Sequence, residues 1–372
     1  MRKVETKKIE FEKVAQSLNE WYTVIKQNNI PKATAMREKI VKALPDMEEN
    51  QNVLLYFNLI DSRFKLMTEN YKASGRLLSS MEHQALETST DDMIQYYFYF
   101  FTGMYHFYEK DFNEAINYYR LAENWINKVP DKIERAEFHY QIAIAFYEIR
   151  QTFFSLHHAE QALEGFTTNE NYSNKIALTN LVIAHNKLDL HQFKSAESLF
   201  KKAIEISKAE QSSDFTKALA YYNLGICYER QDKLNLAEEA FQTGLNSLKQ
   251  ERNYYTLRAS YMLARVMFKK GLIEKGTYWY ENALNLSRNL NETTYEAKLV
   301  VIHSIYKETN ELLLDQGLET LSKLKLWSDV SDLSINAARY FRKQEYFELA
   351  TKYFEKGIST IDKIQAWTEE VE

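Results

Sequence analysis

The fold of this chain is decided by the stretch Ala220-Tyr221-Tyr222-Asn223-Leu224-Gly225-Ile226-Cys227-Tyr228, which is followed by Ala237, Phe241 and Gly244. The small residues Gly225, Ala237 and Gly244 have the spacing expected where the two helices of a helix–turn–helix unit touch backbone to backbone. Only small side chains fit at such contacts, and the ring of Phe241, four residues after Ala237, can fill the groove between the helices. The stretch therefore predicts a pair of closely packed helices.

The same spacing recurs along most of the chain at an interval close to forty residues. Successive small residues lie 40, 41, 41 and 39 positions apart, and one more follows 74 positions later: Ala115, Ser155, Ala196, Ala237, Gly276 and Ala350. This pattern is typical of tetratricopeptide repeats, in which each helix pair buries its apolar face by stacking on its neighbours. It predicts about seven repeats from Asp92 to the C-terminus, including a degenerate one at residues 295–321. Such a stack forms a concave surface that typically binds peptides or proteins.

The composition agrees with an all-α fold in a reducing compartment. The 372 residues include only 3 Pro and 9 Gly, too few for the many turns of a strand-rich protein. A net charge of −5 gives no electrostatic footprint for direct binding to nucleic acid. The single Cys227 cannot form an internal disulfide, and no segment approaches the roughly twenty apolar residues of a membrane span. We expect a cytoplasmic protein without a signal peptide and without a membrane partner.

The N-terminal region lacks the forty-residue interval. It shows three amphipathic segments instead, at residues 8–27, 31–44 and 45–67, which together predict a small helical bundle. Breaks are expected at Ala73-Ser74-Gly75-Arg76 and at residues 87–92, with a short helix between them. The predicted organisation is a three-helix bundle at residues 1–72, a linker with a short helix at 73–92 and a tetratricopeptide-repeat domain at 93–372.

Five short phrases distinguish the chain from a generic repeat protein. They are Leu18-Asn19-Glu20-Trp21-Tyr22, Met47-Glu48-Glu49-Asn50-Gln51, Phe101-Thr102-Gly103-Met104-Tyr105, Gln151-Thr152-Phe153-Phe154-Ser155-Leu156 and Leu188-Asp189-Leu190-His191-Gln192-Phe193. With these phrases the chain resembles the Rap family, the response regulator aspartate phosphatases of sporulating Gram-positive bacteria. The likeness extends from the Trp21 region to Lys356.

The resemblance implies both a fold and a function. Members of that family have an N-terminal three-helix bundle joined by a linker to a right-handed tetratricopeptide superhelix. They bind response regulators of sporulation phosphorelays or competence pathways. Some remove the regulator's aspartyl phosphate, whereas others occlude its DNA-binding domain and do no chemistry. In this form of quorum sensing, secreted and re-imported Phr pentapeptides bind the concave repeat surface and switch the bundle away from its target. The resemblance implies neither which regulator nor which peptide this chain binds.

Gln51 matches the catalytic glutamine of that family. Hydrolysis of an aspartyl phosphate needs a water positioned in line with the phosphorus, and the receiver domain supplies Mg²⁺ and charge neutralisation. The chain therefore needs no cofactor of its own, because an amide can position that water. The alternative is a solvated surface glutamine, and members that do not dephosphorylate can carry the same residue. Asn52 departs from the aspartate that follows in many members.

Three acidic residues precede this glutamine: Asp46, Glu48 and Glu49. The resemblance places them on the surface that docks the response regulator. The alternative is that they lie in a first helical turn, where carboxylates complement the helix dipole without taking part in binding.

Asp189 and Asn223 are the candidate peptide-binding residues. Their offsets from the small residues of the repeats place them on the inner side of the superhelix, and both match peptide contacts of the family. Asn223 can hydrogen-bond an extended peptide backbone, and Asp189 can pair with the Arg of a pentapeptide. The offset of Asp189 adds Glu148 and Lys269 in neighbouring repeats. The alternative is that these side chains cap or bridge helices.

The sequence gives little support for a metal site. The 8 His residues show no metal-ligand spacing, since His157 and His158 point about 100° apart on a helix. Two function hypotheses remain: a peptide-regulated aspartyl-phosphate phosphatase, and a non-catalytic inhibitor that sequesters a regulator's DNA-binding domain. A third, a peptide-sensing transcription factor, would need a basic reading helix, which the acidic phrase Asp46-Met47-Glu48-Glu49 does not provide.

Overall fold

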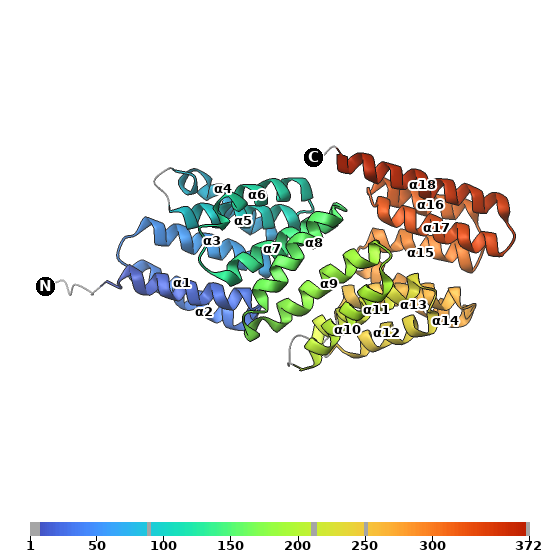
Figure 1. The fold of residues 1–372 in the computed structure, drawn as a ribbon, viewed down its shortest axis with the longest axis horizontal. Helices are drawn as coiled ribbons and strands as arrows, with labels where there is room; N and C mark the ends of the chain where they lie inside the picture. The colour runs from blue at the N-terminus through green and yellow to red at the C-terminus, as the bar shows by residue number, and fades with distance from the viewer. Residues whose placement is uncertain (1–7, 88–90, 210–213, 249–251, 370–372) are drawn as a thin grey trace. The chain divides into compact units, whose positions relative to one another are not determined.

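The computed structural model describes residues 8–87, 91–209, 214–248 and 252–369. Within these ranges the chain forms eighteen α-helices, two short 3₁₀ helices and no β-strand, which confirms the predicted all-α class. The chain divides into two compact units, Met1–Val182 and Ile183–Glu372 (Figure 1). Three residues of the predicted break at 87–92, Thr88, Ser89 and Thr90, lie outside the described residues, as do residues 1–7 of the predicted bundle.

The first unit consists of antiparallel helix pairs. α1 pairs with α2, α3 with α4, α5 with α6, and α7 with α8, while α3 and α4 both pack on α5. The helices and the two 3₁₀ turns of this unit are α1 Phe11–Lys26, α2 Ile30–Ala43, η1 Leu44–Asp46, α3 Gln51–Met67, α4 Tyr71–Ala85, α5 Asp92–Tyr108, α6 Phe112–Ile126, α7 Lys132–Glu148, α8 Thr152–Phe166 and η2 Glu170–Tyr172.

Side-chain caps explain where several of these helices begin. The side-chain oxygens of Asn29, Asn50, Asp91, Asp111 and Asp131 each accept a hydrogen bond from a backbone N–H two or three residues further along, at 2.8 to 3.4 Å. Such caps satisfy one of the free N–H groups in the first turn of a helix.

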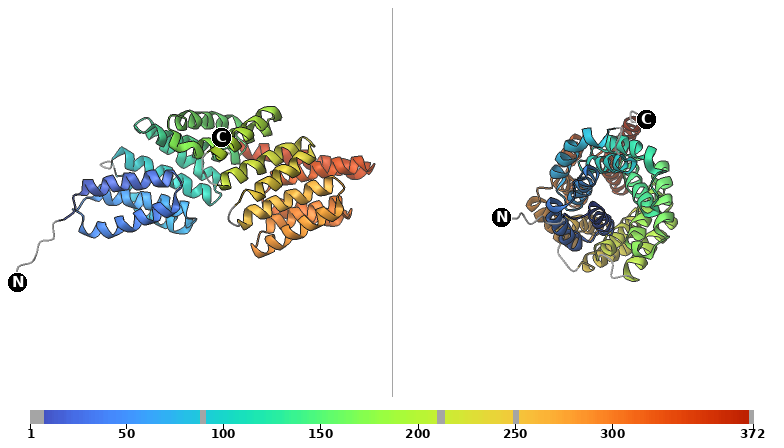
Figure 2. Two further views of the ribbon diagram at one scale, coloured as in Figure 1. Left: turned by 90° about the horizontal axis from the view of Figure 1, so that it is seen from below. Right: turned by 90° about the vertical axis from the view of Figure 1, so that its left-hand side faces the viewer.

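The second unit begins inside α9, which runs from Ser173 to Asp189, and continues the repeats. From α5 onward, six of the predicted helix pairs pack together among the described residues: α5 with α6, α7 with α8, α11 with α12, α13 with α14, α15 with α16 and α17 with α18. The pair of α15 with α16 is the one expected from the degenerate segment. Figure 2 shows the helices of the second unit, coloured from yellow-green to red. The helices are α10 Phe193–Ala209, α11 Asp214–Arg230, α12 Leu234–Asn246, α13 Asn253–Lys269, α14 Ile273–Asn289, α15 Thr293–Tyr306, α16 Glu311–Lys323, α17 Trp327–Lys343 and α18 Phe347–Glu369.

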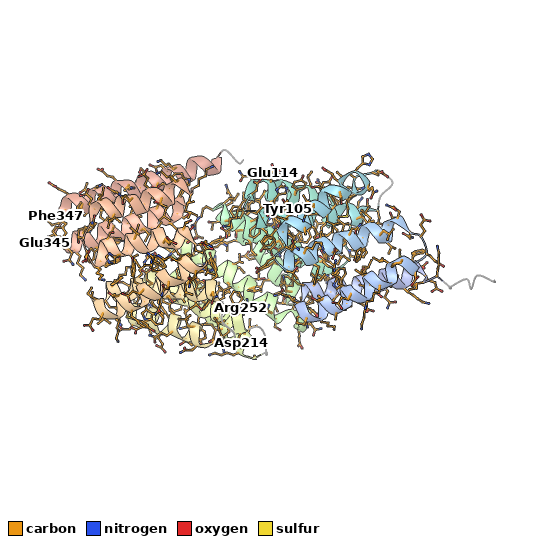
Figure 3. All side chains as sticks on the ribbon, turned by 180° about the vertical axis from the view of Figure 1, so that it is seen from behind. Tyr105, Glu114, Asp214, Arg252, Glu345 and Phe347 are labelled. Carbon is orange, nitrogen blue, oxygen red and sulfur yellow. The ribbon has the colours of Figure 1, made fainter. Side chains whose placement is uncertain are left out.

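The turns inside the helix pairs keep a constant period, and this period begins earlier than predicted. A residue in the left-handed conformation, with φ between 57° and 74°, occurs at intervals of 41, 41, 40, 41, 41 and 39 residues: Asn28, Glu69, Lys110, Arg150, His191, Asp232 and Gly271. Glu345 serves the same purpose between α17 and α18, just before Phe347 (Figure 3). The expectation that the N-terminal region lacks the forty-residue interval is therefore wrong. The turns at Asn28 and Glu69 share the phase of the repeats.

The predicted break at Ala73–Arg76 is also wrong, because these residues lie in the first turns of α4. Gly75 does not end a helix there but lets α4 approach α5, since a Cβ at this position would lie 2.6 Å from the Tyr105 ring. Ser74 donates a hydrogen bond of 3.0 Å to the carbonyl oxygen of Ser62 in α3. Small polar residues that suggested a turn are used here for close helix packing.

Contacts between small residues and rings hold the helix pairs together. A Cβ at Gly103 would lie 2.6 Å from the ring of Tyr119, and a Cβ at Gly225 would lie 2.6 Å from the ring of Phe241. Both rings are fully buried, so neither can swing into solvent to make room. Gly225 and Phe241 are residues that the sequence pattern places at a helix contact.

Substituting Gly225→Ala should destabilise the protein by roughly 1–3 kcal/mol, because the added methyl group overpacks the Phe241 contact. Urea unfolding would measure this loss. Combining Gly225→Ala with Phe241→Leu should cost less than the sum of the two single changes, since the smaller side chain leaves room for the methyl group. Strict additivity would contradict the proposed contact.

Candidate functional site

The acidic residues before Gln51 lie on a short loop that is held at both ends. Asp46 closes the 3₁₀ turn, and Met47 is buried. The backbone of Ile9 joins this loop: its N–H donates to the Asp46 carbonyl at 2.8 Å, and its carbonyl accepts from the Glu48 N–H at 2.8 Å. Asp46, Glu48 and Glu49 are all exposed on this loop. Glu48 and Glu49 precede α3, which begins at Gln51, whereas Asp46 lies in the short 3₁₀ helix η1. The alternative of a first helical turn therefore applies to Asp46 only.

Gln51 is the first residue of α3, and its side chain is exposed. The Asn50 side chain accepts a hydrogen bond from the Val53 N–H at 3.1 Å, which fixes the start of the helix. The next residue, Asn52, is exposed and lines a cavity of about 310 Å³ together with Asn19 and Tyr56. The structure thus presents an amide on a fixed helix end, beside three carboxylates, to a partner in solvent.

A buried cluster of charges joins α1 to α7. The ammonium of Lys26 lies 3.1 Å from Glu134 and 3.0 Å from Asp131. The hydroxyl groups of Tyr22 and Tyr96 donate to the Glu134 carboxylate at 2.9 and 3.2 Å. Burial raises the pKa of Glu134 even though Lys26 opposes it. Burial alone would lower the pKa of Lys26, but the two carboxylates outweigh burial and raise it. Sequence reasoning missed this cluster because its members lie up to 112 residues apart.

Asp189 and Asn223 lie in the second unit, on α9 and α11. Asp189 is the last residue of α9, and its side chain is 20% exposed. It forms a 2.8 Å ion pair with Arg230. Asn223 is 3% exposed and hydrogen-bonds His185, whose pKa is lowered to about 4 by burial. A ligand that contacts Asp189 would therefore meet the Asp189–Arg230 pair.

Lys269 and Glu148, the other two candidate peptide-binding residues, lie in different surroundings. Lys269 on α13 pairs with Glu229, a buried carboxylate that also receives a 3.1 Å hydrogen bond from Arg265. Arg265 extends this cluster to Asp332 at 2.8 Å. Glu148 is the exposed last residue of α7 and belongs to the first unit. Lys269 therefore bridges helices in the structure, as the alternative described.

Several ion pairs join residues about one repeat apart in the sequence, a spacing that the sequence analysis did not use. Arg230 follows Asp189 by 41 residues, Lys269 follows Glu229 by 40, and Lys175 follows Glu137 by 38. Opposite charges one repeat apart, on equivalent faces of successive first helices, face each other across the repeat interface. A search for such pairs would have found Arg230, Glu229 and Lys175.

The histidines form a pair across two helices. The Nδ1 atoms of His139 on α7 and His158 on α8 lie 3.0 Å apart, so one ring donates and the other accepts. Burial lowers their pKa values to about 4 and about 3.

In the part of the chain that the structure describes, no three His, Cys, Asp or Glu side chains are grouped to hold a metal ion. No helix in the same part is both long and apolar enough to cross a bilayer.

Acidification below pH 6.5 should lower the free energy of unfolding. His139 and His158 have folded pKa values of about 4 and 3, so the unfolded chain binds more protons between those values and its ordinary histidine pKa near 6.5. The loss should be about 1–2 kcal/mol per histidine at pH 5. Urea unfolding at pH 7 and pH 5 measures it.

Replacing both histidines (His139→Phe with His158→Phe) should flatten this pH dependence. His83→Gln is the matched control, because the His83 side chain is 93% exposed. A pH dependence of equal size in the double variant and in wild type would contradict the assignment.

Comparison with known proteins adds family evidence to this geometry. Residues 8–69 match the family described as response regulator aspartate phosphatase H, N terminal, and residues 175–250 match a tetratricopeptide-repeat family. The chain is 31% identical to Regulatory protein RapC of Bacillus subtilis (strain 168), covering 92% of each protein. It is 29% identical to Response regulator aspartate phosphatase I of the same organism, covering 96% of this chain and 93% of that protein.

A solved structure agrees with these relatives. The crystal structure of a Rap protein complexed with competence and sporulation factor superposes with a TM-score of 0.85 at 30% sequence identity. The match covers 95% of this chain and 99% of that chain.

Proposed function

Because the chain belongs to the Rap family of bacterial regulators, we propose that it binds a response regulator in the cytoplasm and that Gln51 accelerates hydrolysis of the regulator's aspartyl phosphate. The docking surface in this proposal consists of the loop with Asp46, Glu48 and Glu49 and the start of α3. The observation that carries the proposal is the exposed amide of Gln51 on a capped helix end.

Hydrolysis of the aspartyl phosphate requires few groups from this chain. Water must attack the phosphorus in line with the leaving carboxylate, and the receiver domain supplies the Mg²⁺ that neutralises the developing charge. A partner then contributes mainly by holding the water in place, which lowers the entropic part of the barrier. The Gln51 amide can accept from and donate to one water without changing its own protonation state.

Replacing Gln51 with Ala should abolish the acceleration of phosphate loss while sparing binding to the regulator. The measurement is the lifetime of the aspartyl phosphate on ³²P-labelled receiver domains, with binding followed by calorimetry. Gln242→Ala is the matched control, since Gln242 is an exposed helical glutamine on α12. The enzymatic proposal fails if no receiver domain loses phosphate faster in the presence of the wild-type protein.

A second function rests on the same docking surface. The relatives carry two kinds of name, since RapC is called a regulatory protein and another relative of similar identity a phosphatase. Sequence identity near 30% therefore does not choose between dephosphorylation and sequestration of a DNA-binding domain. A gel-shift competition distinguishes them, because a sequestering protein blocks promoter binding equally well with Gln51 or with Ala at that position.

Control by a peptide is the third part of the proposal. The protein named in the matched crystal structure was complexed with competence and sporulation factor, which supports a peptide ligand here. We place the peptide at Asp189 and Asn223 of the second unit. An Arg of a pentapeptide would compete with Arg230 for the Asp189 carboxylate. Peptide binding then releases the regulator to the extent that the peptide prefers one arrangement of the protein.

Asp189→Asn should weaken binding of an Arg-containing pentapeptide by at least about tenfold, since it removes a charge-assisted hydrogen bond. The probe is a set of synthetic pentapeptides that each carry one Arg, measured by calorimetry. Asp315→Asn is the matched control, because Asp315 forms a comparable ion pair with Lys352 one repeat away, at 2.5 Å. Equal affinity of the wild-type and Asp189→Asn proteins would refute this placement.

A further inference from the structure

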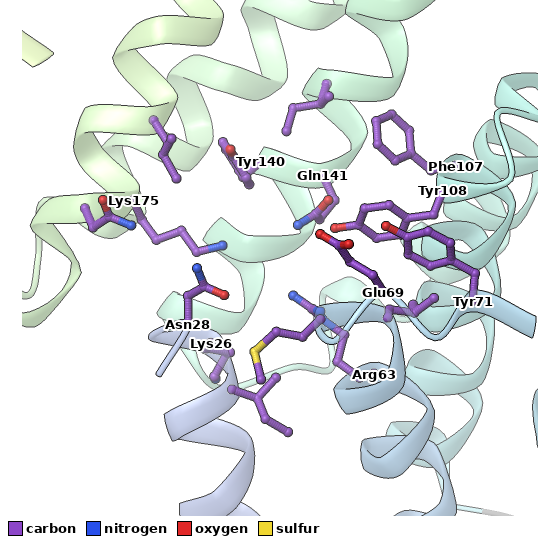
Figure 4. A pocket seen from close by; sticks show the side chains of 16 residues that line it. Lys26, Asn28, Arg63, Glu69, Tyr71, Phe107, Tyr108, Tyr140, Gln141 and Lys175 are labelled. Carbon is purple, nitrogen blue, oxygen red and sulfur yellow. The ribbon is translucent and has the colours of Figure 1, made fainter. Parts of the chain in front are cut away.

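The first unit contains a polar cavity that none of the proposed functions uses. Its volume is about 250 Å³, and its walls come from α1, α3, α4, α5, α7 and α9. Three cations line it, Lys26, Arg63 and Lys175, together with one carboxylate, that of Glu69. Figure 4 shows the Lys175 ammonium and the Gln141 amide directed toward the same space as the Arg63 guanidinium.

Arg63 is buried without a full set of partners. Its side chain is 7% exposed, and its Nε has no hydrogen-bond partner among the described residues. Its nearest carboxylate oxygen is Oε1 of Glu137, 3.7 Å from Nη2, which is too long for a hydrogen bond. This arrangement is costly, because the Nε–H group of a buried guanidinium has lost water without gaining an acceptor.

Glu137 already forms an ion pair with another cation, Lys175. The Lys175 ammonium lies 2.8 and 2.6 Å from its two oxygens, and Gln141 donates to it at 3.1 Å. Burial lowers the pKa of Lys175 although Glu137 opposes this, so even that pair is incompletely compensated. Two buried cations, Arg63 and Lys175, therefore share one buried carboxylate, and the Nε of Arg63 is left without an acceptor.

The geometry points to a binding site for a small oxyanion, a carboxylate or a phosphate, held between Arg63 and Lys175 with the Gln141 amide beside it. The size of the cavity suits an ion or a small metabolite, since pockets for drug-sized ligands occupy about 300–1,000 Å³. An anion there would supply the acceptor that Arg63 Nε lacks. A ligand without an acceptor oxygen would leave this N–H group unpaired.

Occupancy would also join separate parts of the unit. Arg63 belongs to α3, which begins at Gln51, whereas Lys175 and Gln141 belong to α9 and α7. An anion that bonds to side chains of all three helices stabilises the folded unit against unfolding by mass action. The site is thus a predicted stabilising ligand site, independent of whether the chain dephosphorylates a regulator.

The test uses the full chain and two probes, inorganic phosphate and malonate, each against chloride at matched ionic strength. Affinity is measured by calorimetry and by the rise in Tm. Arg63→Met should weaken binding by about tenfold or more, and it leaves Lys175 and Glu137 as a balanced pair. Preference for one probe over the other identifies the carboxylate or the phosphate as the ligand group.

Arg37→Met is the matched control. Arg37 shares Asp61 with Lys65, at 2.5 and 2.9 Å, so its loss also leaves one cation with one carboxylate, but away from the cavity. The control should bind both probes like the wild-type protein. Equal stabilisation of Arg63→Met and Arg37→Met would show a general salt effect and overturn the proposal.

Two further variants keep the test decisive if Arg63→Met does not fold. Lys175→Met also leaves a balanced pair, Arg63 with Glu137, and should lose the probe to a similar extent. Glu69→Gln removes the carboxylate from the cavity wall and should strengthen binding several-fold. Unchanged affinity in both variants, or no binding of either probe to the wild-type protein, contradicts the site.

Discussion

The close approach of paired helices at small residues is the constraint on which the structure depends. Gly103 against Tyr119 and Gly225 against Phe241 show the arrangement, in which the absence of a Cβ makes room for a buried ring. Each contact fixes where the second helix lies on the first, and the left-handed turn between them follows at nearly constant spacing. The constant period then brings equivalent faces of successive helices together. Charged pairs such as Asp189 with Arg230 are a consequence of this period.

The two carboxylates of α7 give the first unit its particular connections. Glu134 and Glu137 are almost completely buried, and each needs cations from other helices: Lys26 of α1 for the former, Lys175 of α9 and Arg63 of α3 for the latter. Replacing such pairs by apolar residues often costs no stability, whereas removing one partner costs about 3–5 kcal/mol. The complete pairs therefore add little to the free energy of unfolding, whereas a chain that lacks one partner is destabilised.

The repeats could be predicted from the sequence because their signal is local and periodic. Small residues at 40-residue intervals located the pairs from α5 to α18, including the degenerate α15 and α16. The N-terminal phase was missed because Gly75, which lies 40 residues before Ala115, was assigned to a break and not to a helix contact. In a sequence, a glycine at a helix contact looks like a glycine in a turn. The buried cations were missed because their partners are distant in the sequence, and no single-helix pattern reports a pair between α1 and α7.

The helix α3 connects the exposed Gln51 to the buried Arg63. Gln51 and Arg63 lie on α3, twelve residues or about 18 Å apart along a helix axis, so the exposed end and the buried charge move as one rigid element. Because positioning a water tolerates errors of only about 1 Å, a small rotation of α3 about its buried end would suffice to disable the amide. Control of such a site does not require a ligand at Gln51. It requires only two packings of α3 on its neighbours α1, α4 and α5 that a ligand distinguishes by its binding free energy.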